Sequence, residues 1–316
     1  MDKEKKAMTD VGTKVLSLPV KSTSKGNGTG QGKPLAVPGE GSAGSQPLKK
    51  ADMANERKFM VDIGLKDLPF PIKALSRENP EGQSTVAGIS IQARIMHEFE
   101  AGWIDRFIEI VHAHRDRIGN ATLRQNIVDY AKEFNATTVK VTFDYPFFME
   151  KRTPVSREKC LVKYDCAFSA KVPSLDDKPK VFFKIAVPCI TTFPGSDALA
   201  GGGLFGQLST VVIETESQKD VYPEDLIDLV DRHALSPLYS FLTREDQEAV
   251  IKRIHSERRT SVVMVDGIKN ELAADRSLAF YSVRCMNFGM LHSYSTMIGT
   301  EKSWWVPFSS MEGDDL

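Results

Sequence analysis

The chain has 316 residues, with 41 Lys and Arg against 42 Asp and Glu, and a formal net charge of −1. This balance excludes a global electrostatic attraction to nucleic acid or to an anionic membrane. The contents of 41% hydrophobic and 26% charged residues are typical of a globular protein with one large domain or two smaller ones. The sequence has no apolar run of the roughly 18 residues that suggest a membrane span and no secretory signal, so we expect a cytoplasmic protein.

The two ends of the chain differ in composition from the middle. Residues 21–50 contain seven of the 22 glycines, and no aromatic residue precedes Phe59. Such a segment cannot bury enough apolar surface to offset its ordering entropy, about 1–2 kcal/mol per residue for the backbone. We therefore expect a disordered tail over 1–56, a folded part over 57–300 and a C-terminal tail over 301–316. The aromatic cluster of Trp304, Trp305 and Phe308 is more typical of a covered subunit surface than of a ligand site.

The folded part shows alternating strand and helical periodicities. In the first half, the expected elements are an extended entry over 59–72, a strand over 86–95, helices over 99–118 and 123–134, and strands over 139–145 and 160–170 separated by a turn at 151–157. In the second half, they are strands over 181–187 and 208–215, helices over 223–233, 244–255 and 259–274, and strands over 279–285 and 290–300, with a turn region at 287–289. This order predicts an α+β fold of two ββααββ units, 57–175 and 176–300, with helices on one face of a largely antiparallel sheet.

The other face of such a sheet needs cover. Closing sheets from several subunits into a barrel is the simplest solution, so we expect a homo-oligomer, possibly a tetramer.

Taken alone, the chemical motifs leave alternatives open. There is no Walker loop, GxGxxG, HExxH or GxSxG motif. The glycine-rich string at 200–206 could hold an anion or act as a connector, and the basic turn at 151–157 could bind phosphate or face solvent. His292 could be an acid/base group or structural. The four cysteines, Cys160, Cys166, Cys189 and Cys285, lack CxxC spacing and favour reduced thiols.

Several ordered motifs between residues 60 and 300 nevertheless resemble a known family. Residues 62–66 read DIGLK, 151–156 read KRTPVS, 224–227 read EDLI, 272–276 read LAADR and 287–292 read NFGMLH. These strings and their spacing are similar to motifs of the type IB GTP cyclohydrolases. The resemblance implies the tunnelling fold (T-fold), here in its bimodular form. It also implies the family reaction, in which GTP and water give 7,8-dihydroneopterin triphosphate and formate for folate and pterin synthesis.

The departures from the family pattern concentrate where the family does its chemistry. The family string TTLCPCSK, which carries a metal-binding and a reactive cysteine, is TTFPGSD at 191–197, with Gly195 in place of one cysteine. Phe205 stands for a metal-binding histidine, and Gln247 stands near an acidic ligand. The purine-anchoring carboxylate of the family falls near Val262, and Gly289 and Tyr294 replace an acid and a second histidine around His292.

By resemblance, the catalytic acid/base is His292, and the substrate-binding residues are Lys151, Arg152, Ser156, Gln207 and Asn287. The family uses a divalent metal such as zinc, whose expected ligands are absent here, so the cofactor stays unknown; Cys189 and His292 are the remaining candidate ligands. A bound metal moves the pKa of water from about 15.7 to about 7, so its loss forfeits about nine orders of magnitude in available hydroxide. A single Cys without His or carboxylate partners is a poor site for a divalent metal, so a buried structural thiol is the favoured role of Cys189.

Three functions follow as hypotheses. The first is an enzyme that still acts on GTP or a related purine or pterin with altered activity. The second is a non-catalytic protein that binds a nucleotide or pterin, or pairs with a true cyclohydrolase. The third is an enzyme recruited to another ring-opening or condensation reaction. Bound zinc or iron in the purified protein would separate the first from the second.

Overall fold

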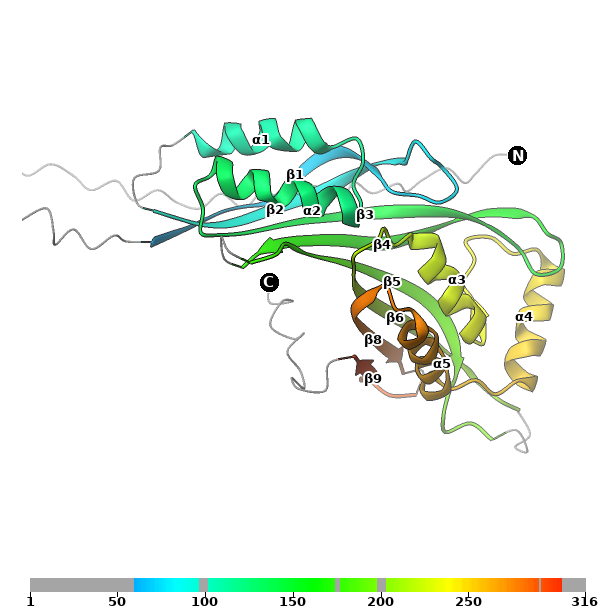
Figure 1. Ribbon diagram of the computed structural model, residues 1–316. Coiled ribbons are helices and arrows are strands. Elements are labelled where there is room, and N and C mark those ends of the chain that lie inside the picture. The colour runs from blue at the N-terminus through cyan, green and yellow to red at the C-terminus, as the bar shows by residue number, and fades with distance from the viewer. Residues whose placement is uncertain (1–59, 97–101, 174–176, 198–202, 290, 303–316) are drawn as a thin grey trace, which may run out of the picture. The chain divides into compact units, whose positions relative to one another are not determined.

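The computed structural model describes residues 60–96, 102–173, 177–197, 203–289 and 291–302. They belong to one compact unit that spans Glu56–Leu316. In chain order the elements are β1 (Met60–Ala74), β2 (Gln83–Met96), α1 (Trp103–His114), α2 (Asn120–Glu133), β3 (Thr138–Arg152), β4 (Lys159–Val172), β5 (Lys180–Thr192), β6 (Gly206–Ser217), α3 (Pro223–His233), β7 (Ser236–Pro237), α4 (Arg244–Ser256), α5 (Ser261–Ala274), β8 (Leu278–Phe288) and β9 (Ser295–Glu301) (Figure 1). The tail expected over 1–56 lies outside the described residues, as do residues 303–316.

The described strands form one antiparallel sheet whose order follows the chain. The order is β1-β2-β3-β4-β5-β6-β8-β9, and the two-residue strand β7 pairs with β5. Helices α1 and α2 connect β2 to β3, and the segment with α3, α4 and α5 connects β6 to β8. The predicted α+β class with an antiparallel sheet is confirmed. That the two halves arose by duplication stays a prediction.

One face of the sheet is buried from β2 to β8, because alternate residues of consecutive strands are apolar and in register. Phe143 on β3 pairs with Phe168 on β4, which pairs with Phe183 on β5, and all three side chains are buried. Helix α2 packs on β3, β4 and β5, α3 on β5, and α5 on β8 and β9, while α1 packs beside α2. The strand alternation read from the sequence therefore marks the helix-covered face.

The opposite face, called the open face below, is charged in its middle. Residues from β3, β4, β5, β6 and β8 line a hollow of about 680 Å³ there, among them Lys140, Asp144, Asp165, Glu214 and Arg284. Charged side chains of both signs lie on this surface, beside apolar ones such as Phe182. Cover of this face by another subunit, and with it the homo-oligomer, stays a prediction.

Several element boundaries differ from those expected, and three of them change the placement of residues discussed above. Helix α1 ends at His114, because Ile118 instead pairs with the end of β1 and exchanges backbone hydrogen bonds with Lys73 and Leu75. Strand β3 runs to Arg152, so the turn covers 153–158 and not 151–157. Strand β8 runs to Phe288, which places residue 287 inside the sheet. No described helix is long and apolar enough to cross a lipid bilayer.

Candidate functional site

A chain of buried polar side chains crosses the ends of β5, β6 and β8 on the helix-covered face. Gln207 Nε2 donates a hydrogen bond to Thr191 Oγ1 at 3.2 Å, and Thr191 Oγ1 lies 2.8 Å from Ser209 Oγ. Ser209 Oγ donates to Asn287 Oδ1 at 2.8 Å. The structure thus brings together Gln207 and Asn287, two of the residues predicted to bind substrate.

The chain of hydrogen bonds has one direction. Ser209 gives its single proton to Asn287, so the hydroxyl of Thr191 must donate to Ser209 and can still accept from Gln207. At the far end, Asn287 Nδ2 donates to Ser261 Oγ at 3.1 Å, at the start of α5. Buried polar groups are costly unless paired, and hydrogen bonds in a chain strengthen one another. The network therefore fixes the side-chain orientations of Gln207 and Asn287.

An apolar pocket adjoins this network where β6 begins. It has a volume of about 340 Å³. Its lining combines side chains at the ends of β5 and β6 with others from the segment before α4 and from α4 itself: Ile190, Phe205, Gly206, Gln207, Leu208, Leu238, Ile251, Ile254 and His255. Gly206 is required there, because a Cβ would lie 2.9 Å from Ile254 Cγ2 and 3.0 Å from Ile190 Cγ2. Phe205, which by resemblance occupies a histidine position, lies beside the altered TTFPGSD segment, since its carbonyl accepts a 2.8 Å hydrogen bond from the Phe193 amide.

The basic turn between β3 and β4 is already engaged with a carboxylate. Asp246 of α4 accepts hydrogen bonds from the backbone amides of Val155 and Ser156 at 2.8 and 2.9 Å and from Ser156 Oγ at 2.6 Å. Burial alone would raise the pKa of Asp246, but the bonds from Ser156, Thr243 and Val155 hold it well below its usual value. Ser156, predicted to contact substrate, therefore binds the carboxylate of Asp246 in this structure.

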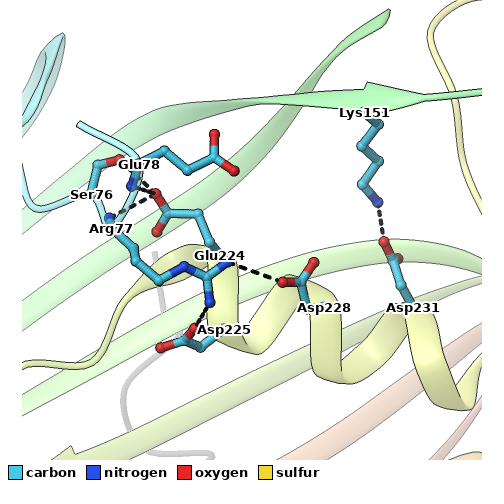
Figure 2. Close-up of polar contacts among 8 residues, drawn as sticks. All are labelled: Ser76, Arg77, Glu78, Lys151, Glu224, Asp225, Asp228 and Asp231. Carbon is cyan, nitrogen blue, oxygen red and sulfur yellow. Dashed lines mark hydrogen bonds and ion pairs between the residues drawn. The ribbon is translucent and has the colours of Figure 1, made fainter. Parts of the chain in front are cut away.

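Lys151 is buried rather than exposed on the turn. Its side chain is 8% exposed, and its Nζ donates to Asp231 Oδ2 of α3 at 2.5 Å (Figure 2). The ammonium also lies 5.3 Å from the ring centroid of Tyr164, a cation–π contact. Burial raises the pKa of Asp231, and the ammonium of Lys151 partly offsets this. Arg152 lies on the exposed side of the strand and donates to the Arg157 carbonyl at 3.3 Å, so the two adjacent cations do not act together.

Helix α3 presents a ridge of four acids, Glu224, Asp225, Asp228 and Asp231, toward the β1–β2 loop and the end of β3 (Figure 2). Glu224 is 1% exposed, and its Oε1 accepts from Ser76 Oγ at 2.5 Å and from the Arg77 amide at 2.9 Å. The Arg77 guanidinium donates to both Asp225 and Asp228. These contacts fasten α3 to the first half of the chain.

His292 lies in the segment between β8 and β9 and is exposed. Its ring stacks on Tyr294 with centroids 4.9 Å apart and planes 8° from parallel. Its imidazole is therefore accessible from solvent. Its role in catalysis stays a prediction.

The described side chains do not fit the divalent metal that the resemblance implies. They contain no group of three or more His, Cys, Asp or Glu residues that could hold a metal ion. Cys189, one candidate ligand, is fully buried with its sulfur 3.8 Å from Met264 Sδ, and burial raises its pKa and disfavours the thiolate that a metal needs. His292, the other candidate, contacts Tyr294. The structure therefore supports no catalytic step through a metal.

Comparison with known proteins gives the family. The family description "Type I GTP cyclohydrolase folE2" matches residues 51–297. The chain belongs to the type I GTP cyclohydrolase FolE2 family. It is 31% identical over 241 residues to the GTP cyclohydrolase FolE2 of Geobacter sp. (strain M21), covering 76% of this chain and 89% of that protein. The FolE2 protein of Citrifermentans bemidjiense is 30% identical with the same coverage.

The expected GTP cyclohydrolase family is thus confirmed, while subclass IB and the loss of motifs stay predictions for this FolE2-family protein. The fold is similar to that of a hyperthermostable urate oxidase variant of Bacillus sp. TB-90. That similarity has a TM-score of 0.50 at 9% identity and covers 77% of this chain and 98% of that one. At this identity the similarity concerns the fold alone.

Sequence reasoning missed the partners of the predicted site residues. Asp231 and Asp246 lie 80 and 90 positions from Lys151 and Ser156, and no local pattern couples them. A signal did exist on α3, where acids at positions 224, 225, 228 and 231 fall on one helical face. Thr191 and Ser209 could have been singled out as polar residues in the buried register of their strands.

Proposed function

We propose that this FolE2-family protein binds GTP or a closely related purine or pterin nucleotide at the ends of β5, β6 and β8, and that its hydrolysis of GTP is altered or lost. Its relatives at about 30% identity are named GTP cyclohydrolases, which supports the ligand class. The observation that carries the location is the buried chain from Gln207 to Asn287, because Gln207, at one end of that chain, also lines the Phe205 pocket. An oriented amide next to an apolar wall is suited to a planar heterocycle with donors and acceptors on its edge.

The altered chemistry is inferred from the side chains that are available to bind a metal. Hydrolysis at neutral pH needs an activated water, and among the described residues no cluster of metal-ligating side chains could supply one. His292 is the acid/base group that could still move a proton, by analogy with the family. A ligand could therefore bind without being turned over at a cyclohydrolase rate.

The test combines metal analysis, formate release and calorimetry on the full-length protein. We expect much less than one zinc or iron per chain, no rapid formate release from GTP, and measurable binding of GTP. Gln207→Ala should weaken GTP binding at least about tenfold, because it removes a polar contact from a dry site. Gln92→Ala, which changes an exposed glutamine on β2, is the matched control and should leave binding unchanged.

Stoichiometric tightly bound metal with metal-dependent formate release would contradict the altered-chemistry part of this proposal. No binding of GTP, pterins or purines would contradict the ligand part. Binding with no chemistry would favour the second hypothesis, a nucleotide- or pterin-binding partner, over the recruited enzyme.

A homo-oligomer, possibly a tetramer, is part of the same proposal. Apolar side chains at one end of the open face are exposed across consecutive strands, with Leu208 at 46%, Met286 at 40%, Phe288 at 39% and Met297 at 51%. The registers of β6, β8 and β9 make these residues neighbours. A patch of this kind favours a subunit contact. Light scattering at micromolar concentration tests it, and a stable monomer would contradict it.

A further inference from the structure

Helix α4 is held to the protein in an unusual way. Among its thirteen residues, Asp246 is the buried one, whereas Ile251, on the side facing the Phe205 pocket, is 52% exposed. Burial of an apolar stripe is what normally fixes a surface helix. This helix therefore depends on a polar contact near its first turn.

The Asp246 carboxylate joins two separate segments. Within α4 it forms a capping box with Thr243, whose backbone amide donates to Asp246 Oδ2 at 3.1 Å while the Asp246 amide donates to Thr243 Oγ1 at 3.3 Å. Across the chain it accepts the bonds from Val155 and Ser156 described above. A capping side chain normally forms hydrogen bonds only within its own helix. Here the same carboxylate also fastens the helix to the β3–β4 turn.

The other end of α4 forms a wall of the Phe205 pocket. Ile254 lies against Gly206, and the His255 ring Nδ1 is 2.8 Å from the Leu204 carbonyl oxygen. Ile251, Ile254 and His255 all line the pocket, as Gln207 does. Because a helix is stiff, the contact at Asp246 sets where these three side chains lie.

We propose that Asp246 is a positioning residue, which fixes α4 on the β3–β4 turn and thereby holds the wall of the pocket that contains Gln207. Ser156 helps to hold α4 on this turn, because its hydroxyl and its amide both donate hydrogen bonds to this carboxylate. The effect on α4 is independent of any ligand. Only the effect on ligand affinity rests on the proposed function.

The test is hydrogen exchange of the ligand-free full-length protein, followed by GTP binding. In Asp246→Ala we expect exchange at least about tenfold faster in residues 244–256 and 153–158, with the sheet unchanged, because charge-assisted bonds are lost locally. Ser156→Ala, which keeps the carboxylate and the helix cap, should show a smaller change in the same two segments. Glu245→Gln changes the exposed neighbouring acid and should match the wild type.

The binding measurement separates positioning from direct contact. In each variant, Asp246→Ala or Ser156→Ala, the Kd for GTP and the Kd for guanosine should rise by a similar factor, because the change acts through the pocket wall and not on the phosphates. A loss confined to GTP in Ser156→Ala, with guanosine unaffected, would show that Ser156 contacts the phosphates and would overturn the assignment. Unchanged exchange of α4 in both variants would also overturn it. If no variant binds GTP, the proposed function fails, while the exchange result still decides the role of Asp246.

Discussion

Removing the carboxylate of Asp231 should destabilise the protein strongly, because it leaves the Lys151 ammonium buried and unpaired. At the Nζ–Oδ2 distance of 2.5 Å the attraction is about 7 kcal/mol at an effective dielectric constant of 20. In the intact pair the desolvation free energy of the two charges offsets most of this attraction. When Asp231 is removed, the Lys151 ammonium still loses its hydration but no longer gains the attraction. With the two side chains 8% and 18% exposed, we expect Asp231→Ala to lower the free energy of unfolding by about 3–5 kcal/mol.

Urea unfolding followed by circular dichroism measures this loss, with a double-mutant cycle as the assay. The double variant Lys151→Met with Asp231→Leu should lie within about 1–2 kcal/mol of the wild type, because an apolar pair can replace a buried ion pair. The exposed pair of Lys159 and Glu150 on the same hairpin is the control, and Glu150→Ala should cost at most about 1 kcal/mol. If Asp231→Ala costs no more than Glu150→Ala, or if the double variant is the least stable, the reasoning is refuted.

Three further predictions concern other groups. Burial raises the pKa of Cys285 to about 11, so iodoacetamide at pH 8 should not label it until denaturant is added; fast labelling of the native protein would contradict its burial. Ser209→Ala leaves Thr191 and Asn287 each short of a partner and should cost about 1–3 kcal/mol in urea unfolding, clearly more than Thr210→Ala on the open face. The pKa of Asp246 is lower in the folded state than in the unfolded one, so its contribution to stability is present above about pH 4 and lost as pH falls further. The urea midpoint of the wild type should therefore fall more steeply between pH 5 and pH 3 than that of Asp246→Asn, and parallel curves would count against this.

The sheet could be predicted from the sequence because its signal is local. Residues 139–145 alternate between apolar and polar types, residues 181–187 carry large apolar side chains at every second position, and the structure buries these apolar positions on the helix-covered face. The family could likewise be identified from ordered motifs. These signals need no knowledge of distant partners.

The geometry of the candidate site could not be predicted in the same way. Lys151 looks like part of an exposed basic turn, but β3 continues to Arg152, and the strand alternation turns the lysine inward onto α3. The partner Asp231 lies 80 residues away, so only the tertiary fold brings the two together. The same holds for Ser156 with Asp246. The candidate substrate-binding residues could be chosen from their residue types and motifs. Their contacts, however, depend on how the helices pack on the sheet.

The sequential order of the sheet bears on how the protein is made. Each strand of the main path pairs with a predecessor that is next to it in the chain or separated from it by one helical segment. A ribosome therefore delivers β1 to β6 and then β8 in the order in which each can add to an existing edge. Each newly added strand stabilises the one before it, so the growing chain never has to hold an apolar strand unpaired until a distant partner emerges. Assembly from the N-terminal edge toward β9 also leaves the end of the sheet that carries Met286, Phe288 and Met297 to be completed last.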